Sequence, residues 1–172
     1  MKIRFLTVLL LLAAIVIGVA YYHRQNAANA AEPTKKPLTM TFTDINGKKI
    51  KMADYRGKVV VIDVWATWCG YCVAEIPDLI KYQQEQIDKK TNVQLIGLSI
   101  DRSKKDVQAF VKENKLNYPI IVADRAALKP FGSIPGVPMK FIVNKKGVIV
   151  DTRVGAGDIK ELEEAVAKYL KE

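Results

Sequence analysis

The chain has 172 residues, about the size of one domain, and its 49% hydrophobic and 26% charged residues are typical of a protein with an apolar core. Two cysteines and one histidine, His23, are too few for a Cys/His zinc site or a disulfide-rich scaffold, and we expect no metal and no cofactor. The net charge of +9 includes the basic residues of an acid-free N-terminus, and the remaining surplus is spread as pairs and singles, which argues against nucleic acid as a partner.

The N-terminal segment predicts a membrane anchor. Phe5–Tyr22 is an uncharged, largely apolar run, and as a helix it would rise roughly 27 Å, close to the thickness of a bilayer core. Lys2 and Arg4 precede it, so the positive-inside rule places the N-terminus in the cytoplasm and exports the rest. We therefore expect a single-pass protein of a bacterial cytoplasmic membrane, with a signal-anchor and the start of a tether in residues 1–30. The alternative is a cleaved signal peptide, cut after Ala28-Asn29-Ala30, and a secreted protein.

Residues 31–37 are polar, contain two prolines and lack apolar periodicity, which predicts a linker to a single folded domain over residues 38–172. The domain opens with strand-like segments at 38–42 and 50–52 on either side of Asn46-Gly47, a dipeptide that favours a tight hairpin turn. We therefore expect an N-terminal β-hairpin.

Two apolar runs, 59–65 and 93–100, predict parallel strands buried on both faces, and the helical spacing between them predicts a helix over 70–88. Together they form a right-handed βαβ unit. A helix over 103–114, a strand over 120–122, a hairpin of strands 141–143 and 148–150, and a final helix starting near Asp158 complete the predicted β-α-β-α-β-β-α order.

The strongest chemical signal is the pair Cys69 and Cys72, directly after a buried strand and at the start of the long helix. The helix N-terminus favours a thiolate on the first cysteine. Cys69 can then attack a substrate disulfide, and Cys72 can resolve the mixed disulfide that forms. The alternatives are a purely structural disulfide, which would constrain only two intervening residues, or half of a metal site without partners.

Residues 65–77, WATWCGYCVAEIP, resemble the active-site signature of the thioredoxin superfamily, in particular its membrane-tethered TlpA/ResA-like thiol-disulfide oxidoreductases. The resemblance continues through Gly57-Lys58, Tyr118-Pro119 and Gly136-Val137-Pro138, and covers nearly all of residues 38–172. It implies an α/β, thioredoxin-like fold, with a central mixed sheet flanked by helices, an N-terminal β-hairpin and a central helical insertion. It also implies a cis proline at Pro138 facing the cysteines.

The resemblance implies a substrate-binding surface around the sulfurs. The Val137 backbone, freed by Pro138, would pair with an extended substrate segment. Trp68 would flank Cys69 as an exposed recognition surface, although packing in the interior is an equal alternative. Tyr71 departs from the family pattern, which often has proline there. Because Gly-Tyr offers no cation to hold a thiolate, we expect a fairly reducing protein.

Met139 is a second departure, since threonine commonly follows the cis proline in the family. It would place a flexible thioether beside the sulfurs and change substrate preference.

Two carboxylates match positions at which branches of the superfamily carry a buried acid: Asp63, within the first core strand, and Glu75, within the helix. A carboxylate in apolar surroundings has a raised pKa and can take a proton from Cys72 when that thiol attacks the mixed disulfide. We expect Asp63 and Glu75 to share this work as a coupled pair. The alternatives are that Glu75 caps the helix or faces solvent, and that hydrogen bonds satisfy Asp63.

These observations predict an enzyme that reduces disulfides in exported proteins. By resemblance, its clients would include apocytochrome c, and its electrons would come from a membrane-embedded thiol donor. The first alternative is an oxidase or isomerase of folding exported proteins, which shares the chemistry and differs in redox potential. A peroxidase of the peroxiredoxin kind needs a P-x-x-x-T-x-x-C loop, and a copper chaperone of the Sco type needs C-x-x-x-C and a histidine in the domain; neither pattern is present.

Overall fold

The computed structural model describes Gly18 and residues 33–171. The chain divides into two compact units, Met1–Glu32 and Pro33–Glu172, and the fold described below belongs to the second. The predicted membrane span and the end of the anchor at residue 30 lie outside the described residues, apart from Gly18. Within the described residues, no helix is both long and apolar enough to cross a membrane. The Thr34 N–H donates to the Pro130 carbonyl at 2.9 Å, so part of the predicted linker contacts the domain.

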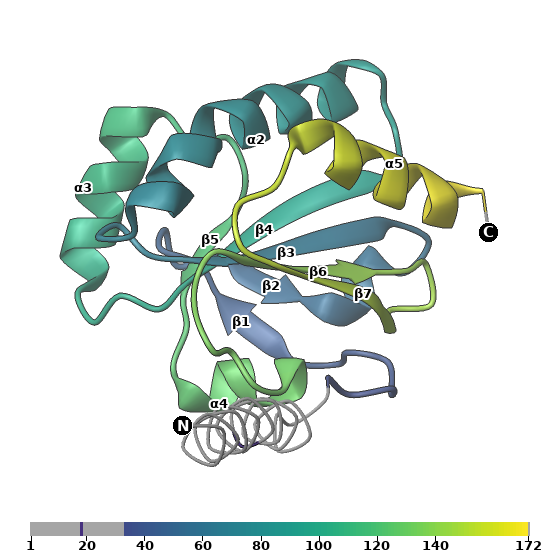
Figure 1. Ribbon diagram of the computed structural model, residues 1–172, viewed down its shortest axis with the longest axis horizontal. Coiled ribbons are helices and arrows are strands. Elements are labelled where there is room, and N and C mark those ends of the chain that lie inside the picture. Colours follow the sequence, from purple (N-terminus) through teal and green to yellow (C-terminus); the bar gives the residue numbers. More distant parts are fainter. Residues whose placement is uncertain (1–17, 19–32, 172) are drawn as a thin grey trace, which may run out of the picture. The chain divides into compact units, whose positions relative to one another are not determined.

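A five-stranded mixed sheet forms the centre of the second unit, in the order β5-β4-β3-β6-β7 (Figure 1). Strands β3, β4 and β5 are parallel, whereas β6 is antiparallel to both of its neighbours, β3 and β7. A separate antiparallel hairpin pairs β1 with β2. The strands are β1 (Thr41–Thr43), β2 (Lys49–Lys51), β3 (Val59–Trp65), β4 (Val93–Ser99), β5 (Ile120–Val122), β6 (Met139–Val143) and β7 (Ile149–Val154). The predicted mixed sheet and opening hairpin are confirmed.

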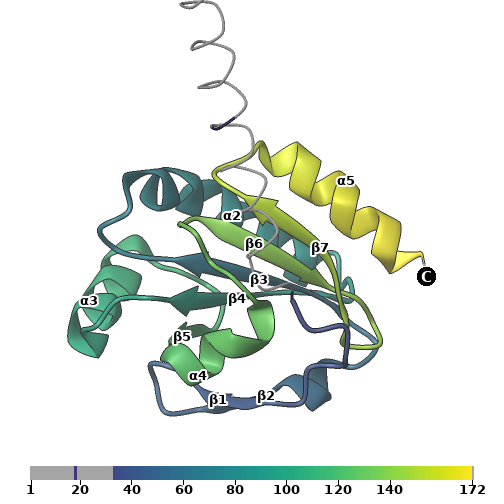
Figure 2. The ribbon, with the colours of Figure 1, turned by 60° about the horizontal axis from the view of Figure 1, so that its bottom comes forward.

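Apolar residues cover both faces of this sheet. The sheet lies between two layers of other elements (Figure 2). On one face the apolar residues pack against helices α2 (Gly70–Asp88), α3 (Lys104–Asn114) and α5 (Ile159–Leu170). On the other face they pack against the β1–β2 hairpin and the short helices α4 (Arg125–Leu128) and η2 (Lys129–Phe131). A further short helix, η1 (Met52–Tyr55), follows β2. The helical segments α3, α4 and η2 lie between β4 and β6.

Strand β3 is buried along its whole length, as expected for the central strand of a sheet covered on both faces. Because side chains alternate along a strand, Val61 and Trp65 point toward the cluster beneath α2, and Ile62 and Val64 point toward the opposite cluster. The same alternation places the Asp63 side chain on the α2 face. The sheet thus positions a carboxylate beneath the helix that carries the cysteines.

Several predicted boundaries are wrong by a few residues. The first hairpin pairs Thr41 with Lys51, so residues 38–40 precede the paired segment, and β2 ends where η1 begins. Strand β6 begins two residues before the predicted start at 141, and β7 extends to Val154, because pairing between the strands continues past their apolar centres. Helix α4 was not predicted, since a four-residue helix is too short to show apolar periodicity.

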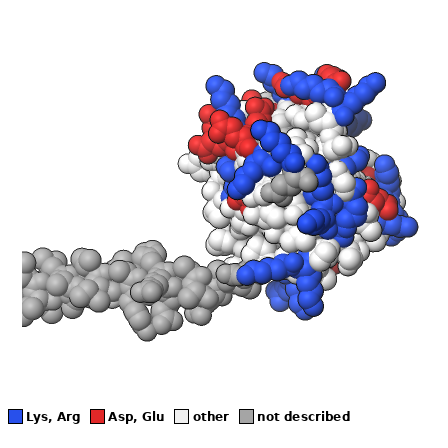
Figure 3. Space-filling model, turned by 90° about the vertical axis from the view of Figure 1, so that its right-hand side faces the viewer, with Lys and Arg blue, Asp and Glu red and all other residues white. Residues whose placement is uncertain are grey.

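One face of the second unit carries its charges in scattered groups. On the face seen in Figure 3, lysine and arginine side chains lie in several places, separated by uncharged and acidic side chains. This face therefore shows no continuous basic stripe of the kind that tracks a nucleic-acid backbone.

Gly97 in β4 lies so close to neighbouring side chains that a larger residue has no room there. It lies directly across from Asp63, and a Cβ atom there would come within 2.5 Å of Ile120 Cδ1 and 2.9 Å of Trp65 Nε1. Both neighbouring side chains are buried, so Gly97→Ala is expected to destabilise the protein by about 1–3 kcal/mol through overpacking. Urea unfolding measures the change. Gly157→Ala, with nothing within 4 Å of its Cβ, is the control, and an equal effect of the two substitutions would contradict the prediction.

Candidate active site

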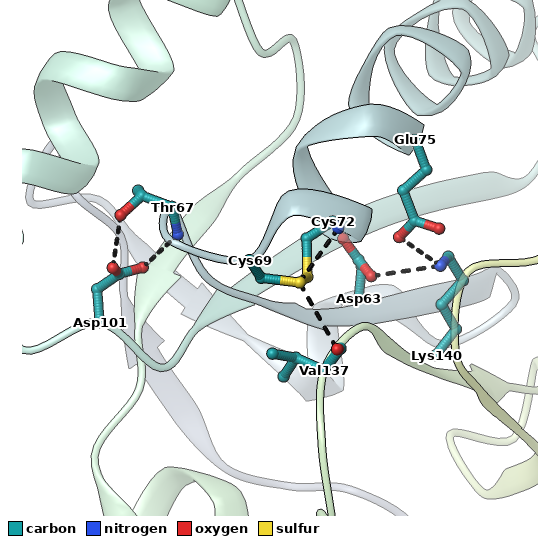
Figure 4. Close-up of a disulfide and its surroundings, with 8 residues drawn as sticks. All are labelled: Asp63, Thr67, Cys69, Cys72, Glu75, Asp101, Val137 and Lys140. Carbon is teal, nitrogen blue, oxygen red and sulfur yellow. Dashed lines mark hydrogen bonds and ion pairs between the residues drawn. A yellow bond between two sulfur atoms is a disulfide. The ribbon is translucent and has the colours of Figure 1, made fainter.

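The loop between β3 and α2 is fixed by one buried carboxylate. Asp101 accepts hydrogen bonds from the Thr67 N–H at 2.9 Å and from the Thr67 hydroxyl at 2.6 Å (Figure 4). The Ser99 hydroxyl donates to the same carboxylate at 2.7 Å. Because β3 and β4 are parallel, their carboxyl ends meet at one edge of the sheet, and Trp65 pairs with Ser99 there. The segment that leads to Cys69 is therefore tied to the end of the neighbouring strand.

Cys69 and Cys72 form a disulfide at the N-terminus of α2, with their Cα atoms 5.2 Å apart. Cys69 is the N-cap residue, and the Cys72 N–H donates to Cys69 Sγ at 3.2 Å. This hydrogen bond and the helix dipole would both stabilise a thiolate on Cys69 after reduction. Cys69 is 7% exposed and Cys72 is 1% exposed. The geometry suits an outer attacking sulfur and an inner resolving one, which is the predicted division of roles.

The peptide bond between Val137 and Pro138 is cis, as the family resemblance predicts. The Val137 carbonyl oxygen lies 3.6 Å from Cys69 Sγ, so this segment approaches the outer sulfur directly (Figure 4). The Pro138 carbonyl accepts a hydrogen bond from the Gly155 N–H at 2.9 Å, which links the segment to the end of β7. Two chain segments remote in sequence therefore meet beside the cysteines.

Large apolar side chains near the sulfurs are exposed. Trp68 is 68% exposed and Tyr71 is 76% exposed, so the alternative that Trp68 packs in the interior is wrong. Val154, beside the segment of Pro138, is 67% exposed. Two of the four exposed large apolar side chains in the described part of the chain, Trp68 and Tyr71, therefore lie directly beside Cys69 in the sequence.

The expected position of Met139 beside the sulfurs is wrong for its side chain. Met139 is 5% exposed and packs in the cluster on the sheet face opposite α2, together with Phe131 and Phe141. It is the first residue of β6, so the alternation of the strand decides its direction. Met139 therefore supports the core, and its neighbour Lys140 points toward the cysteine side.

A buried cluster of three charged side chains lies on the α2 side of the sheet. Lys140 Nζ lies 2.6 Å from Glu75 Oε1 and 3.8 Å from Asp63 Oδ1 (Figure 4). The side chains of Lys140, Glu75 and Asp63 are 7%, 10% and 2% exposed. The alternatives for Glu75, a helix cap or a solvated side chain, are therefore wrong. Asp63 Oδ1 accepts no hydrogen bond within the described residues, so hydrogen bonding does not satisfy this oxygen.

Burial dominates the acid–base properties of the cluster. Loss of solvation raises the pKa of Asp63 to about 7, although the Lys140 charge opposes the shift; the Glu75 charge adds to it. Burial also raises the pKa of Glu75, again against the effect of Lys140. The pKa of Tyr118 is raised by its own burial and by the two carboxylates. Asp63 is thus a carboxyl group that can gain and lose a proton near neutral pH.

Three residues of the site, Lys140, Asp101 and Thr67, are not predicted from the sequence. The sequence does contain an indication for Lys140. A lone lysine within the apolar run MKFIV of a buried strand requires a partner for its charge. Asp101 follows a buried parallel strand and so lies at the same sheet edge as the cysteines. No group of three or more His, Cys, Asp or Glu side chains over residues 33–171 could hold a metal ion.

Comparison with known proteins shows which family the chain belongs to. Residues 33–152 match the AhpC/TSA family. The chain belongs to the AhpC/TSA family. It is 35% identical over 120 residues to the thioredoxin-like protein YneN of Bacillus subtilis (strain 168), with 70% of each chain covered. It is 29% identical over 170 residues to the thiol-disulfide oxidoreductase ResA of Bacillus cereus (strain ATCC 10987 / NRS 248), with 97% of this chain and 96% of the relative covered.

The fold has a matching structural neighbour. A thiol:disulfide interchange protein of the thioredoxin family from Chlorobium tepidum TLS superposes with a TM-score of 0.71 at 25% identity, over 81% of this chain and 98% of the other. The thioredoxin-like fold and the ResA-like resemblance are therefore confirmed. This member of the AhpC/TSA family is a thiol-disulfide oxidoreductase with a Cys69–Cys72 redox pair.

Proposed function

We propose that the protein reduces disulfides in exported proteins, including apocytochrome c, at the outer side of a bacterial cytoplasmic membrane. In this proposal, residues 1–30 anchor the chain, and a membrane-embedded thiol donor reduces the Cys69–Cys72 disulfide. Two observations support it: the near full-length similarity to ResA proteins and the apolar N-terminal run. Cleavage after Ala30 and secretion is the alternative for the N-terminus.

The proposed reaction transfers two electrons from the cysteine pair to the client. The Cys69 thiolate attacks one sulfur of the client disulfide, forms a mixed disulfide and releases the first client thiolate. The Cys72 thiol then gives its proton to a buried carboxylate and attacks Cys69 Sγ. The Cys69–Cys72 disulfide forms, the second client thiolate leaves with the bonding electron pair, and each client thiolate takes up a proton from water.

One observation carries the proposal: the sulfur pair connects an exposed apolar surface to a buried pair of carboxylates. Cys69 lies among the exposed side chains Trp68 and Tyr71, and Cys72 lies on the same side of the sheet as Asp63 and Glu75. An exposed apolar surface fits an unfolded, extended client, and the backbone of Val137, beside Cys69 Sγ, offers it a pairing edge. A buried base fits the deprotonation of the inner thiol.

The proposal is tested by offering the reduced protein a peptide with an oxidised Cys-x-x-Cys-His segment, the motif to which c-type haem is attached. We expect stoichiometric peptide reduction and formation of the Cys69–Cys72 disulfide, followed by thiol alkylation and mass spectrometry. The oxidised protein is offered a reduced, unfolded protein with native disulfides in a parallel assay. Efficient oxidation in that assay, without reduction of the peptide, would support the oxidase or isomerase alternative instead.

Trp68→Ala tests the client-binding surface. We expect KM for a disulfide-bonded peptide to rise about tenfold, because truncating an exposed aromatic anchor costs more than about 1 kcal/mol at a binding hot spot. A small aromatic disulfide contacts far less of this surface, so its reduction should be affected less. Parallel kinetics on the two substrates measure the difference, with Tyr55→Ala, in a half-buried aromatic of η1, as the control. Equal losses on both substrates would show that Trp68 has no specific role with clients.

A further inference from the structure

Lys140 occupies a position that the reaction described above does not explain. It is the only charged residue in β6, and it faces Asp63 directly across the β3–β6 ladder. Its ammonium group forms a short hydrogen bond of 2.6 Å with Glu75 Oε1 and lies 3.8 Å from Asp63 Oδ1. One cation is therefore shared unequally by two carboxylates, of which only Glu75 is within hydrogen-bonding distance.

The balance of charge indicates that this cluster holds one proton. Two ionised carboxylates and one ammonium would leave an uncompensated negative charge in the interior, which is costly. Binding of one proton makes the cluster neutral. Glu75 is the better anion, because a charge-assisted hydrogen bond to Lys140 stabilises its ionised form. Asp63 is the better proton acceptor, because it is 1% exposed and its Oδ1 lies 3.8 Å from the Lys140 ammonium, outside hydrogen-bonding distance.

The two carboxylates also differ in their access to solvent. A cleft of about 330 Å³ is lined by Glu75, Lys140 and the loop of residues 155–158, but neither Asp63 nor Cys72 lines it. In the view of Figure 4, the Asp63 carboxylate lies between Cys72 and Lys140. Glu75 and Lys140 therefore face the cleft, whereas the Asp63 carboxyl group does not line it.

We infer that Lys140 is a positioning residue of the exchange reaction: it holds Glu75 as the anion and leaves Asp63 as the carboxyl group that exchanges a proton with Cys72. The inference rests on the proposed role of the buried carboxylates, and it replaces a shared role of the two by a division of roles. When Cys72 attacks the mixed disulfide, its proton passes to the Asp63 carboxylate. The resulting carboxylic acid returns the proton when a thiol donor later reduces the Cys69–Cys72 disulfide.

Other ionisable groups face this cluster and bear on its titration. From the segment before β5, the Tyr118 side chain faces both carboxylates, and its burial keeps it neutral near neutral pH. From α2, the Cys72 thiol of the reduced protein adds a second titrating group. The charged groups that line the cleft beside Glu75 and Lys140 are Asp78, Arg153, Asp158 and Glu161. These four are common to every variant proposed below, so they do not change the comparison.

The test is the pH dependence of the resolving step in the reduced full chain. Reaction with 5,5′-dithiobis(2-nitrobenzoate) releases one coloured thiolate when Cys69 attacks and a second when Cys72 resolves. We expect the second phase to accelerate as Asp63 loses its proton. In Lys140→Met the midpoint should move to higher pH by at least one unit, which slows the second phase at neutral pH by about fivefold or more. Lys140→Arg should keep the midpoint near that of the unchanged protein.

Three further variants make the outcome decisive. Lys146→Met, in an exposed lysine of the same hairpin, is the matched control and should leave the midpoint in place. In Asp63→Asn, the rate of the second phase should no longer increase near neutral pH. Only the increase caused by ionisation of the Cys72 thiol itself should remain. The double variant Lys140→Met with Glu75→Gln removes both members of the ion pair and should restore most of the original midpoint, because Asp63 no longer faces a second anion. It also keeps the test available if Lys140→Met does not fold.

The inference is overturned if Lys140→Met folds and shows the same midpoint as Lys146→Met. It is also overturned if the increase near neutral pH survives in Asp63→Asn and is lost in the double variant, since Glu75 would then be the exchanging group. A second phase independent of pH in the unchanged protein would overturn the proton-transfer role and the inference together. The assay uses a small disulfide, so a result against the proposed clients or direction would leave this outcome unaffected.

Discussion

Cys72→Ser is expected to convert the protein into a trap that stays covalently attached to its disulfide substrate through Cys69, with turnover reduced to the uncatalysed background. Cys69 is the more exposed sulfur, and it accepts the hydrogen bond of the Cys72 N–H at the helix N-terminus, so its thiolate is the stabilised one. Without a second thiol, nothing in the chain can displace the client, because the protein has no other cysteine.

The trap is measured by non-reducing electrophoresis and mass spectrometry of the adduct. Cys69→Ser is the matched variant and should form no adduct, because Cys72 is 1% exposed and buried against the core. Adduct formation on Cys72 in Cys69→Ser, at a rate similar to that of the trap on Cys69, would reverse the assigned roles.

The second large effect is a loss of stability of the oxidised protein as pH rises. Burial raises the pKa of Asp63 from 3.8 to about 7, so the folded chain binds this proton more tightly than the unfolded chain does. The stabilising contribution is complete below the unfolded value of 3.8 and is lost as pH rises through about 7. With about 1.36 kcal/mol for each pKa unit, the free energy of unfolding should fall by about 4 kcal/mol across this window.

Asp63→Asn should lack this component, because the amide does not titrate. Urea unfolding of the oxidised proteins at several pH values from about 3.8 to above 7 gives the difference between them, in which the other titrating groups largely cancel. Asp54→Asn, at an exposed aspartate, is the control and should follow the unchanged protein. Parallel pH profiles of the Asp63→Asn variant and the unchanged protein would mean that Asp63 is not held as a buried acid.

Local patterns in the sequence correctly predicted the strand and the helix on either side of the cysteines. The apolar run of β3 and the helical spacing of α2 are set by neighbouring residues, and they placed Cys69 and Cys72 at a strand–helix junction without knowledge of the rest. The cis bond before Pro138 came from the family resemblance, since residue types alone give an X–Pro bond only a low cis frequency.

The buried ion cluster could not be predicted in the same way, because it depends on register between distant strands. Asp63 and Lys140 meet only because β3 and β6 pair in antiparallel orientation with these residues opposite each other. The predicted strand also began at 141, so the alternation that turns Met139 into the core and Lys140 toward the cysteines was not applied to them. Likewise, the tie between Thr67 and Asp101 spans 34 residues and exists only after β3 and β4 align. The anchor in residues 1–30 stays a prediction.

The central claim, that the protein acts as a reductant, is tested most directly by the equilibrium redox potential of the Cys69–Cys72 couple. The full chain is equilibrated with dithiothreitol or glutathione of defined ratio, and the two thiols are trapped by alkylation and counted by mass. We expect a potential near or below the roughly −270 mV of thioredoxin, because Gly70 and Tyr71 place no cation between the cysteines. A value near the roughly −120 mV of a strong periplasmic oxidant would contradict the reducing role and favour a catalyst of disulfide formation.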